Sequence, residues 1–240
     1  NVAAILVGAS IGVLIGHRLP ERTRTTVTDA LGLVTLVIGG LNVVALQDEA
    51  FTAAVGGGVT LLVVLGALLI GGITGSLLGL ESRLEDLGSW LQRRLAPGEG
   101  SGSRARFVEG FVDSSLIFCI GPLAVLGALS DGLGQGIDEL ALKSALDGFA
   151  AIAFAASLGW GVAASALSVG AWQGFLTVVA VLVGDIMSPE LVAAITATGG
   201  VLLLGVGMRL LNLKAIPVGD MLPALIVAPL LTAAVAAVVT

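Results

Sequence analysis

Residues 61–72 read LLVVLGALLIGG, and this stretch decides the class of fold. It carries no charged side chain and shows no alternation of polar and apolar residues. Strands of a membrane β-barrel alternate in this way over about ten residues. A helix instead needs about 20 mostly apolar residues to cross about 30 Å of hydrocarbon. The stretch therefore predicts a membrane-spanning helix.

The composition of the whole chain agrees with this prediction. Its 240 residues are 56% hydrophobic and 12% charged, with a mean hydropathy of +1.06, whereas soluble domains are about half apolar and about a quarter charged. We predict an all-α membrane protein, a single bundle of about eight transmembrane helices. The spans lie near residues 1–17, 26–46, 52–80, 108–129, 141–163, 167–187, 190–211 and 217–239. The start of the third span, FTAAVGGG, also fits a loop or a re-entrant segment.

Lysine and arginine are concentrated in three of the predicted connections. Such residues are retained on the cytoplasmic side of short loops, and eight spans with an outside N-terminus bring all three connections to that side. They are Arg18, Arg22 and Arg24; Arg83, Arg93, Arg94, Arg104 and Arg106; and Arg209 and Lys214. The opposite loops, QDEA, SDGLGQGIDE and MSPE, have no basic residue. We therefore expect the N-terminus outside.

The predicted bundle, residues 1–240, divides into four units. Residues 1–80 and 167–240 hold three spans each, residues 107–166 form a central two-span hairpin, and residues 81–106 combine an amphipathic interfacial helix with a tether. Pro20-Glu21 and Pro189-Glu190 each precede glycines seven apart, which are Gly32 and Gly39 in the first unit and Gly200 and Gly207 in the second. Five spans separate the two units, so we interpret them as an inverted repeat, with accidental similarity as the alternative.

Glycines at helical spacing form a second pattern. Gly8, Gly12 and Gly16 share one face of the first span, and small residues four apart let membrane helices approach closely. Tight helix packing is the interpretation that we favour over a glycine-lined permeation path. The same faces also suit a homo-oligomer.

Prolines and a carboxylate interrupt the last span. Residues 217–230 read PVGDMLPALIVAPL, and a proline inside a helix removes one donor and frees a carbonyl on the preceding turn. Because freed groups in lipid must face protein, water or an ion, Asp220 and Pro223 are candidates for a binding site at a kink. The alternative is a first-turn acid favoured by the helix dipole in a helix that proline merely bends.

The fourth and fifth spans carry further candidates. Gly121-Pro122 repeats the helix break near mid-membrane, and Asp113 and Ser114 lie near the cytoplasmic end of the same span. In the fifth span Asp147 lies deep, where an ionised group is costly unless it is paired or hydrated. Lys143 is one turn earlier, so either a salt bridge or an ion site that includes Ser144 explains the pattern. Asn42 is a weaker candidate, since an interhelical hydrogen bond would also explain it.

Several functional classes find no support in the sequence. The metalloprotease HExxH pattern, CxxC, a P-loop and a dinucleotide fingerprint are all absent. Cys119 is the only cysteine, which excludes an intrachain disulfide. We therefore expect no cofactor and no nucleic-acid partner, leave a metal undecided, and expect the lipid bilayer and a small solute or ion as partners.

Several stretches carry a resemblance that covers nearly the whole chain. They include VGASIGVLIGHRLPER, FCIGPLAVLGAL, KSALDG and MLPAL, in this order. Together they are similar to the DUF554 or YqgA/YdfK-like family of uncharacterised bacterial inner-membrane proteins. The resemblance implies a multi-pass protein of the inner membrane in a group that looks like transporters. We expect a secondary transporter or channel with its site at the broken spans; the alternatives are a structural or signalling membrane module and, third, an intramembrane enzyme.

Overall fold

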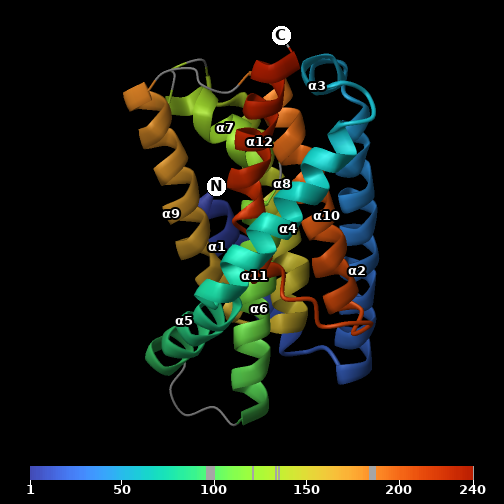
Figure 1. The fold of residues 1–240 in the computed structure, drawn as a ribbon. Helices are drawn as coiled ribbons and strands as arrows, with labels where there is room; N and C mark the ends of the chain where they lie inside the picture. The colour runs from blue at the N-terminus through green and yellow to red at the C-terminus, as the bar shows by residue number, and fades with distance from the viewer. Residues whose placement is uncertain (96–100, 121, 133, 135, 184–187, 240) are drawn as a thin grey trace.

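The computed structural model describes residues 1–239 apart from 96–100, 121, 133, 135 and 184–187 (Figure 1). The described residues form helices joined by turns and loops, with no strand among them. The helices are α1 (Val2–Gly16), α2 (Glu21–Val43), the 3-10 helix η1 (Val44–Gln47), α3 (Glu49–Val55), α4 (Thr60–Leu78), α5 (Leu80–Leu95), α6 (Ser101–Cys119), α7 (Pro122–Gly132), α8 (Asp138–Leu158), α9 (Gly161–Val183), α10 (Pro189–Leu210), α11 (Val218–Met221) and α12 (Ala224–Val239). The prediction of an all-α membrane protein is confirmed.

Six helical segments of the described chain are long and apolar enough to cross a membrane. They are Glu21–Gln47, Thr60–Leu78, Asp138–Leu158, Gly161–Val181, Pro189–Leu210 and Val218–Val238. A seventh is added if the bent pair α6 and α7 counts as one span, whereas α1 has only 15 residues. The predicted count of about eight is not confirmed, since α1 is shorter than the about 17 residues that a full span needs.

The predicted third span is divided in two. The Asp48 side chain accepts hydrogen bonds from the backbone N–H groups of Ala50 and Phe51, at 2.9 and 3.1 Å, and so caps the short helix α3. Gly56 then has φ 91°, a conformation that glycine adopts without strain. The chain thus turns at residues 56–58 before α4 begins, and FTAAVGGG is not part of the span.

Both helix breaks that the prolines predict are present. The axes of the helical stretches Gly102–Cys119 and Leu123–Gly132, in α6 and α7, are bent by 76°. In the last span α11 ends at Met221 and α12 begins at Ala224, with Pro223 between them. Pro229 lies inside α12 and does not end it. The helix therefore tolerates the loss of one backbone hydrogen bond at Pro229, whereas it is interrupted at Pro223.

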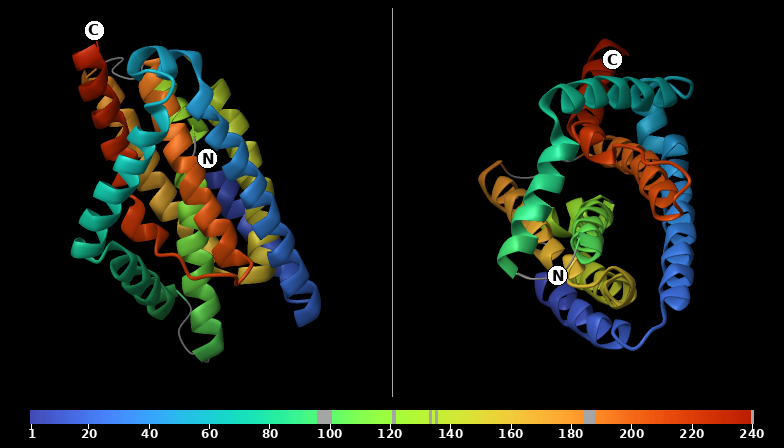
Figure 2. Two further views of the ribbon diagram at one scale, coloured as in Figure 1. Left: turned by 45° about the vertical axis from the view of Figure 1, so that its right-hand side comes forward. Right: turned by 90° about the horizontal axis from the view of Figure 1, so that it is seen from below.

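Helix α6 lies inside the bundle, within a ring of the other helices (Figure 2, right). Its side chains Phe111, Val112 and Phe118 have no exposed surface and belong to the largest apolar cluster of the described residues. The outward surfaces are apolar too, as at Leu77 and Phe149, which are 83% and 76% exposed. An apolar exterior around a packed interior is what a lipid environment requires.

Most of the basic residues lie at one end of the bundle. The α1–α2 connection, helix α5 with the start of α6, and the α10–α11 connection lie at the lower end of Figure 1, whereas α3 and α7 lie at the upper end. Helix α5 packs on α6, with Leu91 buried and Trp90 47% exposed. Helix α6 already begins at Ser101, inside the segment predicted as a tether; residues 96–100 of that segment lie outside the described residues.

Candidate functional site

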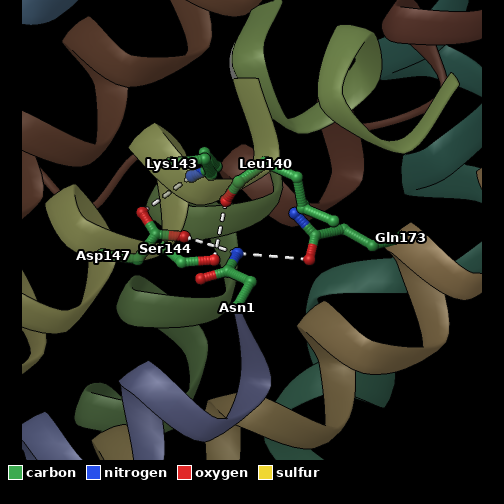
Figure 3. Close-up of polar contacts among 6 residues, drawn as sticks. All are labelled: Asn1, Leu140, Lys143, Ser144, Asp147 and Gln173. Atoms are coloured by element: carbon green, nitrogen blue, oxygen red, sulfur yellow. Dashed lines mark hydrogen bonds and ion pairs between the residues drawn. The ribbon is translucent and has the colours of Figure 1, made fainter. Parts of the chain in front are cut away.

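A polar cluster lies deep in the bundle, where α1, α8 and α9 meet (Figure 3). Lys143 Nζ lies 2.7 Å from Asp147 Oδ1, and both residues are at least 94% buried. The Asn1 side-chain amide donates to Asp147 Oδ2 at 2.8 Å and to Gln173 Oε1 at 3.1 Å. The carboxylate thus receives one charged donor and one neutral donor on separate oxygens.

The glycines of α1 place Asn1 beside Asp147. A side chain at Gly8 or Gly12 would overlap the backbone of α8, at the carbonyl oxygens of Gly148 and Ile152. Because these positions carry no side chain, the two backbones approach closely, as small residues allow in membranes. The interpretation of this glycine face as a packing surface is confirmed, and the surface determines which residues contact the start of α1.

Ser144 and Lys143 each make one further contact with a group outside the ion pair. Ser144 Oγ donates to the Leu140 carbonyl one turn earlier, at 2.7 Å, so its hydroxyl proton is used within α8. Lys143 Nζ lies 6.0 Å from the centre of the Phe118 ring at the end of α6, within the range of a cation–π contact. The ion pair therefore lies next to the break between α6 and α7.

A second charged cluster joins α5, α6 and α10. Arg209 Nη1 bonds to Glu81 Oε1, and Arg209 Nε lies 3.1 Å from Asp113 Oδ1. Asp113 is fully buried, and the geometry of this ion pair does not satisfy hydrogen-bond angles, so neither Asp113 oxygen has a hydrogen bond from a described residue. Ser114 Oγ is likewise buried without such a bond. The Arg209 guanidinium thus forms ion pairs with two carboxylates, those of Glu81 and Asp113.

Asp220 and Glu81 hold α5 and α11 together by a reciprocal contact. Asp220 Oδ1 accepts from the Glu81 backbone N–H at 2.8 Å, and Glu81 Oε2 accepts from the Gly219 backbone N–H at 2.6 Å. Each carboxylate therefore satisfies an N–H near the start of the partner's helix, where acids are favoured. The structure gives Asp220 this capping contact, and its part in solute binding stays a prediction.

A cavity of about 310 Å³ lies between the two helix breaks. Cys119 and Ile120 line it from the end of α6, and Leu222 and Pro223 line it from the break between α11 and α12. Its polar groups include the hydroxyls of Ser115 and Ser168, which are 3.1 Å apart, while Trp172 also lines it. The Trp172 indole nitrogen is buried and has no hydrogen-bond partner among the described residues.

The structure brings only some of the predicted site residues together. Lys143 and Asp147 are paired, Ser144 is adjacent, and Pro223 lines the cavity. Asp113 and Asp220 belong to the charged clusters around Glu81. Asn42 lies on α2 against Gly200 of α10, away from both sites. Gly121 lies outside the described residues; Pro122 begins α7, but its side chain is not described.

Several partners were not identified from the sequence as part of a site. Asn1, Glu81 and Arg209 come from helices far apart along the chain, and no spacing rule joins them. A signal existed for Arg209, which follows the uncharged residues 191–208 of α10. A cation in such a position suggests a buried acid nearby. Within the described residues, no group of three or more His, Cys, Asp or Glu side chains could hold a metal ion.

Comparison with known proteins gives the family. Residues 1–233 match the family described as "Protein of unknown function (DUF554)". The chain belongs to the DUF554 family. It is 32% identical over 234 residues to "Uncharacterized protein YqgA" of Escherichia coli (strain K12), an alignment that covers 98% of this chain and 94% of the relative.

A second relative is described as a membrane protein. "Uncharacterized membrane protein YdfK" of Bacillus subtilis (strain 168) is 27% identical over 231 residues, covering 95% of this chain and 92% of that protein. No solved structure matches the chain. Family membership and the apolar helices together establish a membrane protein of the DUF554 family.

Proposed function

We propose that this DUF554 protein is a secondary transporter or channel of the bacterial inner membrane that moves a small solute past the cavity between its two helix breaks. The observation that carries the proposal is the lining of this cavity by both breaks, Cys119–Ile120 on one side and Leu222–Pro223 on the other. Transporters commonly bind substrate where membrane helices are discontinuous. Backbone groups freed at a break are tolerated where protein or a cavity satisfies them.

The lining of the cavity favours a largely apolar solute over an ion. Apolar side chains such as Leu84, Leu116 and Ile226 form most of it, and no charged side chain of the described residues lines it. The two serine hydroxyls already bond to each other. Trp172 adds an aromatic side chain to this lining, while its indole N–H is buried without a partner among the described residues. Such a site resembles the mostly apolar pockets with few polar groups that bind small molecules.

The packing of α2 against α10 supports the inverted repeat. The glycines that the two units share meet reciprocally: a side chain at Gly39 would lie 2.9 Å from the Gly200 carbonyl oxygen, and one at Gly200 would lie 2.8 Å from that of Gly39. Gly207 in turn faces Gly32. A two-fold axis between the two helices would relate the Gly39–Gly200 contact to the Gly207–Gly32 contact, and this arrangement supports an inverted repeat.

Other elements follow the same pairing. Each proposed unit has a short helix before its last long helix, α3 before α4 and α11 before α12. The helices α4 and α12, which are equivalent in the two units, pack on each other. If α1 is equivalent to α9, and α8 to α6, then the contact of α1 with α8 corresponds to the contact of α9 with α6. These relations support spans 1–3 and 6–8 as related units around a central hairpin. Counting α1 as a partial span and α6 with α7 as one gives the eight segments of this arrangement.

The alternative of a structural or signalling module without transport also has an observation in its favour. Lys143 and Asp147 are paired with each other and buried, which is what a static, closed bundle requires. We therefore place the solute in the cavity and not at this ion pair.

Cys119, the only cysteine of the chain, provides the experiment because it lines the cavity. The wild-type protein in right-side-out and inside-out vesicles is treated with 2-sulfonatoethyl methanethiosulfonate, a charged thiol reagent that does not cross membranes. A solute path open in turn to each side predicts modification of Cys119 in both preparations, measured by intact-protein mass. The C119S variant gives the background.

A matched pair of variants locates the reaction. Ser168→Phe adds a ring inside the cavity and is expected to slow modification at least about tenfold. Leu167→Phe adds the same ring at the neighbouring position, 60% exposed on the outside of α9, and is expected to leave the rate unchanged. Modification from one side only would show that the cavity is a pocket open to that side and not part of a path across the membrane. If neither the charged reagent nor the neutral N-ethylmaleimide modifies Cys119 before unfolding, the closed module is favoured instead.

A further inference from the structure

A second cavity lies at the basic end of the bundle, away from both helix breaks. Its volume is about 210 Å³, and residues from the α1–α2 connection, the start of α6 and the α8–α9 connection line it. The polar lining residues are His17, Arg24, Ser103, Arg106 and Ser157, and the aromatic ones besides His17 are Phe107 and Trp160. It shares no lining residue with the cavity at the helix breaks, so it requires a separate explanation.

The charges around this cavity are of one sign. Arg24 and Arg106 bring two permanent positive charges, His17 adds an imidazole, and no carboxylate of a described residue lines the cavity. Concentrating like charges costs free energy unless an anion compensates them. Arg106 makes no ion pair with another described residue. The described chain therefore leaves this charge uncompensated.

Arg24 is held in place by the backbone. Its Nε and Nη2 donate to the Gly16 carbonyl oxygen at 3.2 and 2.6 Å, at the end of α1. Ser157 Oγ donates to the Arg24 carbonyl at 2.9 Å, which ties the start of α2 to α8. These contacts fix the guanidinium at the cavity wall while leaving N–H groups unused. They also occupy the Gly16 carbonyl, which would otherwise repel an anion.

The position of the cavity fits a group at the membrane surface. Trp160 lines it and is 47% exposed, and tryptophan is enriched at the depth of lipid headgroups. Arginine guanidinium groups bind phosphate oxygens through paired, charge-assisted hydrogen bonds, and basic pockets between membrane helices bind phosphate headgroups. The volume is sufficient for a phosphate group with its immediate substituents.

We propose that this cavity binds a phosphate group, through Arg106 and Arg24 with His17 beside them, independently of any transport by the protein. The chemistry is shared by an anionic phospholipid headgroup and by free phosphate. Either ligand would compensate the charge at the start of α6 and connect α1, α6 and α8 through a common anion.

Thermal unfolding of the purified protein in an uncharged detergent tests the site. Inorganic phosphate and phosphatidylglycerol are titrated separately, with phosphatidylcholine as the neutral-headgroup control, and the rise in unfolding temperature with concentration gives an apparent affinity. We expect saturable stabilisation by at least one of the two anionic ligands. Stabilisation by inorganic phosphate indicates a free-phosphate site, and stabilisation by phosphatidylglycerol alone indicates a headgroup site.

Two arginines of α6 supply the matched comparison. Arg106→Gln removes a side chain that lines the cavity and is expected to weaken the binding about tenfold, the loss typical of one charge-assisted hydrogen bond. Both residues are exposed, but Arg104 lies outside the cavity lining, so Arg104→Gln removes the same charge and is expected to change the binding less than about twofold. Equal losses in both variants would show only general attraction of anions and would overturn the proposal.

A second pair of variants covers the case in which Arg106→Gln does not fold. His17 lines the cavity and Arg18 does not, so His17→Gln is expected to weaken binding more than Arg18→Gln does. Absence of stabilisation by both inorganic phosphate and phosphatidylglycerol in the wild-type protein would also overturn the proposal.

Discussion

At the scale of single residues, Lys143 and Asp147 should show the behaviour of a buried ion pair. Lys143→Met leaves the Asp147 carboxylate buried with only the Asn1 amide as partner, and breaking a buried pair from one side costs about 3–5 kcal/mol. We expect a clear loss of unfolding free energy, measured by denaturant titration in detergent. The double variant Lys143→Met with Asp147→Leu removes both charges and should recover most of it. A double variant as unstable as the single one would mean that the Asp147 contact with Asn1, rather than the ion pair, stabilises the cluster.

This pair also shows what a sequence predicts at the residue scale. Lys143 and Asp147 are four apart on one helix, and helix geometry alone places them together. Arg209, Glu81 and Asp113 could not be joined in this way, because their contacts depend on how α5, α6 and α10 pack. The capping contact of Asp220 was missed for the same reason: its partner, the Glu81 N–H, lies on another helix.

At the scale of helices, the approach of α1 to α8 should depend on the missing side chains of α1. Gly12→Ala would place a methyl group against the Ile152 carbonyl oxygen and 2.8 Å from the Ala155 methyl group, so α1 must move away. We expect a loss of about 1–3 kcal/mol, as for other overpacked interiors, together with loss of the Asn1 contact to Asp147. Gly40→Ala is the control, since nothing lies within 4 Å of its added methyl group. Thermal unfolding of both variants measures the difference, and equal stability would show that this helix pair is not tightly packed.

Helix ends were predicted well where a residue determines them chemically. Proline cannot donate a backbone hydrogen bond, so the break between α6 and α7 and the break at Pro223 were predicted from the positions of the prolines. The division of the third span was more ambiguous, because it depends on Asp48 capping α3 and on the turn at Gly56. Pro229 carried the same signal as Pro223 but lies inside α12. A local rule thus indicates where a helix is able to break, and packing decides whether it does.

At the scale of the whole molecule, the amphipathic pattern of residues 81–95 predicted a helix at the interface but not the surface that it would cover. Leu84 and Leu91 turn towards the interior, and Gly88 packs on Phe111 of α6, while Leu87 and Trp90 remain exposed. Helix α5 also lines the cavity between the breaks through Leu80 and Leu84. It therefore connects the basic end of the bundle with the proposed solute path, which the sequence pattern alone did not indicate.

The distribution of charge predicts how the whole molecule lies in the membrane. Because basic connections stay in the cytoplasm, the end that carries α5 and the α1–α2 connection should face inward, and the end that carries η1 and α3 should face outward. In a Cys119→Ser background, Gln47→Cys places a thiol at the outward end and Thr23→Cys places one at the inward end, both at exposed positions. A membrane-impermeant maleimide added to right-side-out vesicles should label the first variant at once and the second only after permeabilisation, as read from the mass shift on a gel. Immediate labelling of Thr23→Cys would reverse the orientation, and with it the side of the membrane from which the phosphate site would be filled.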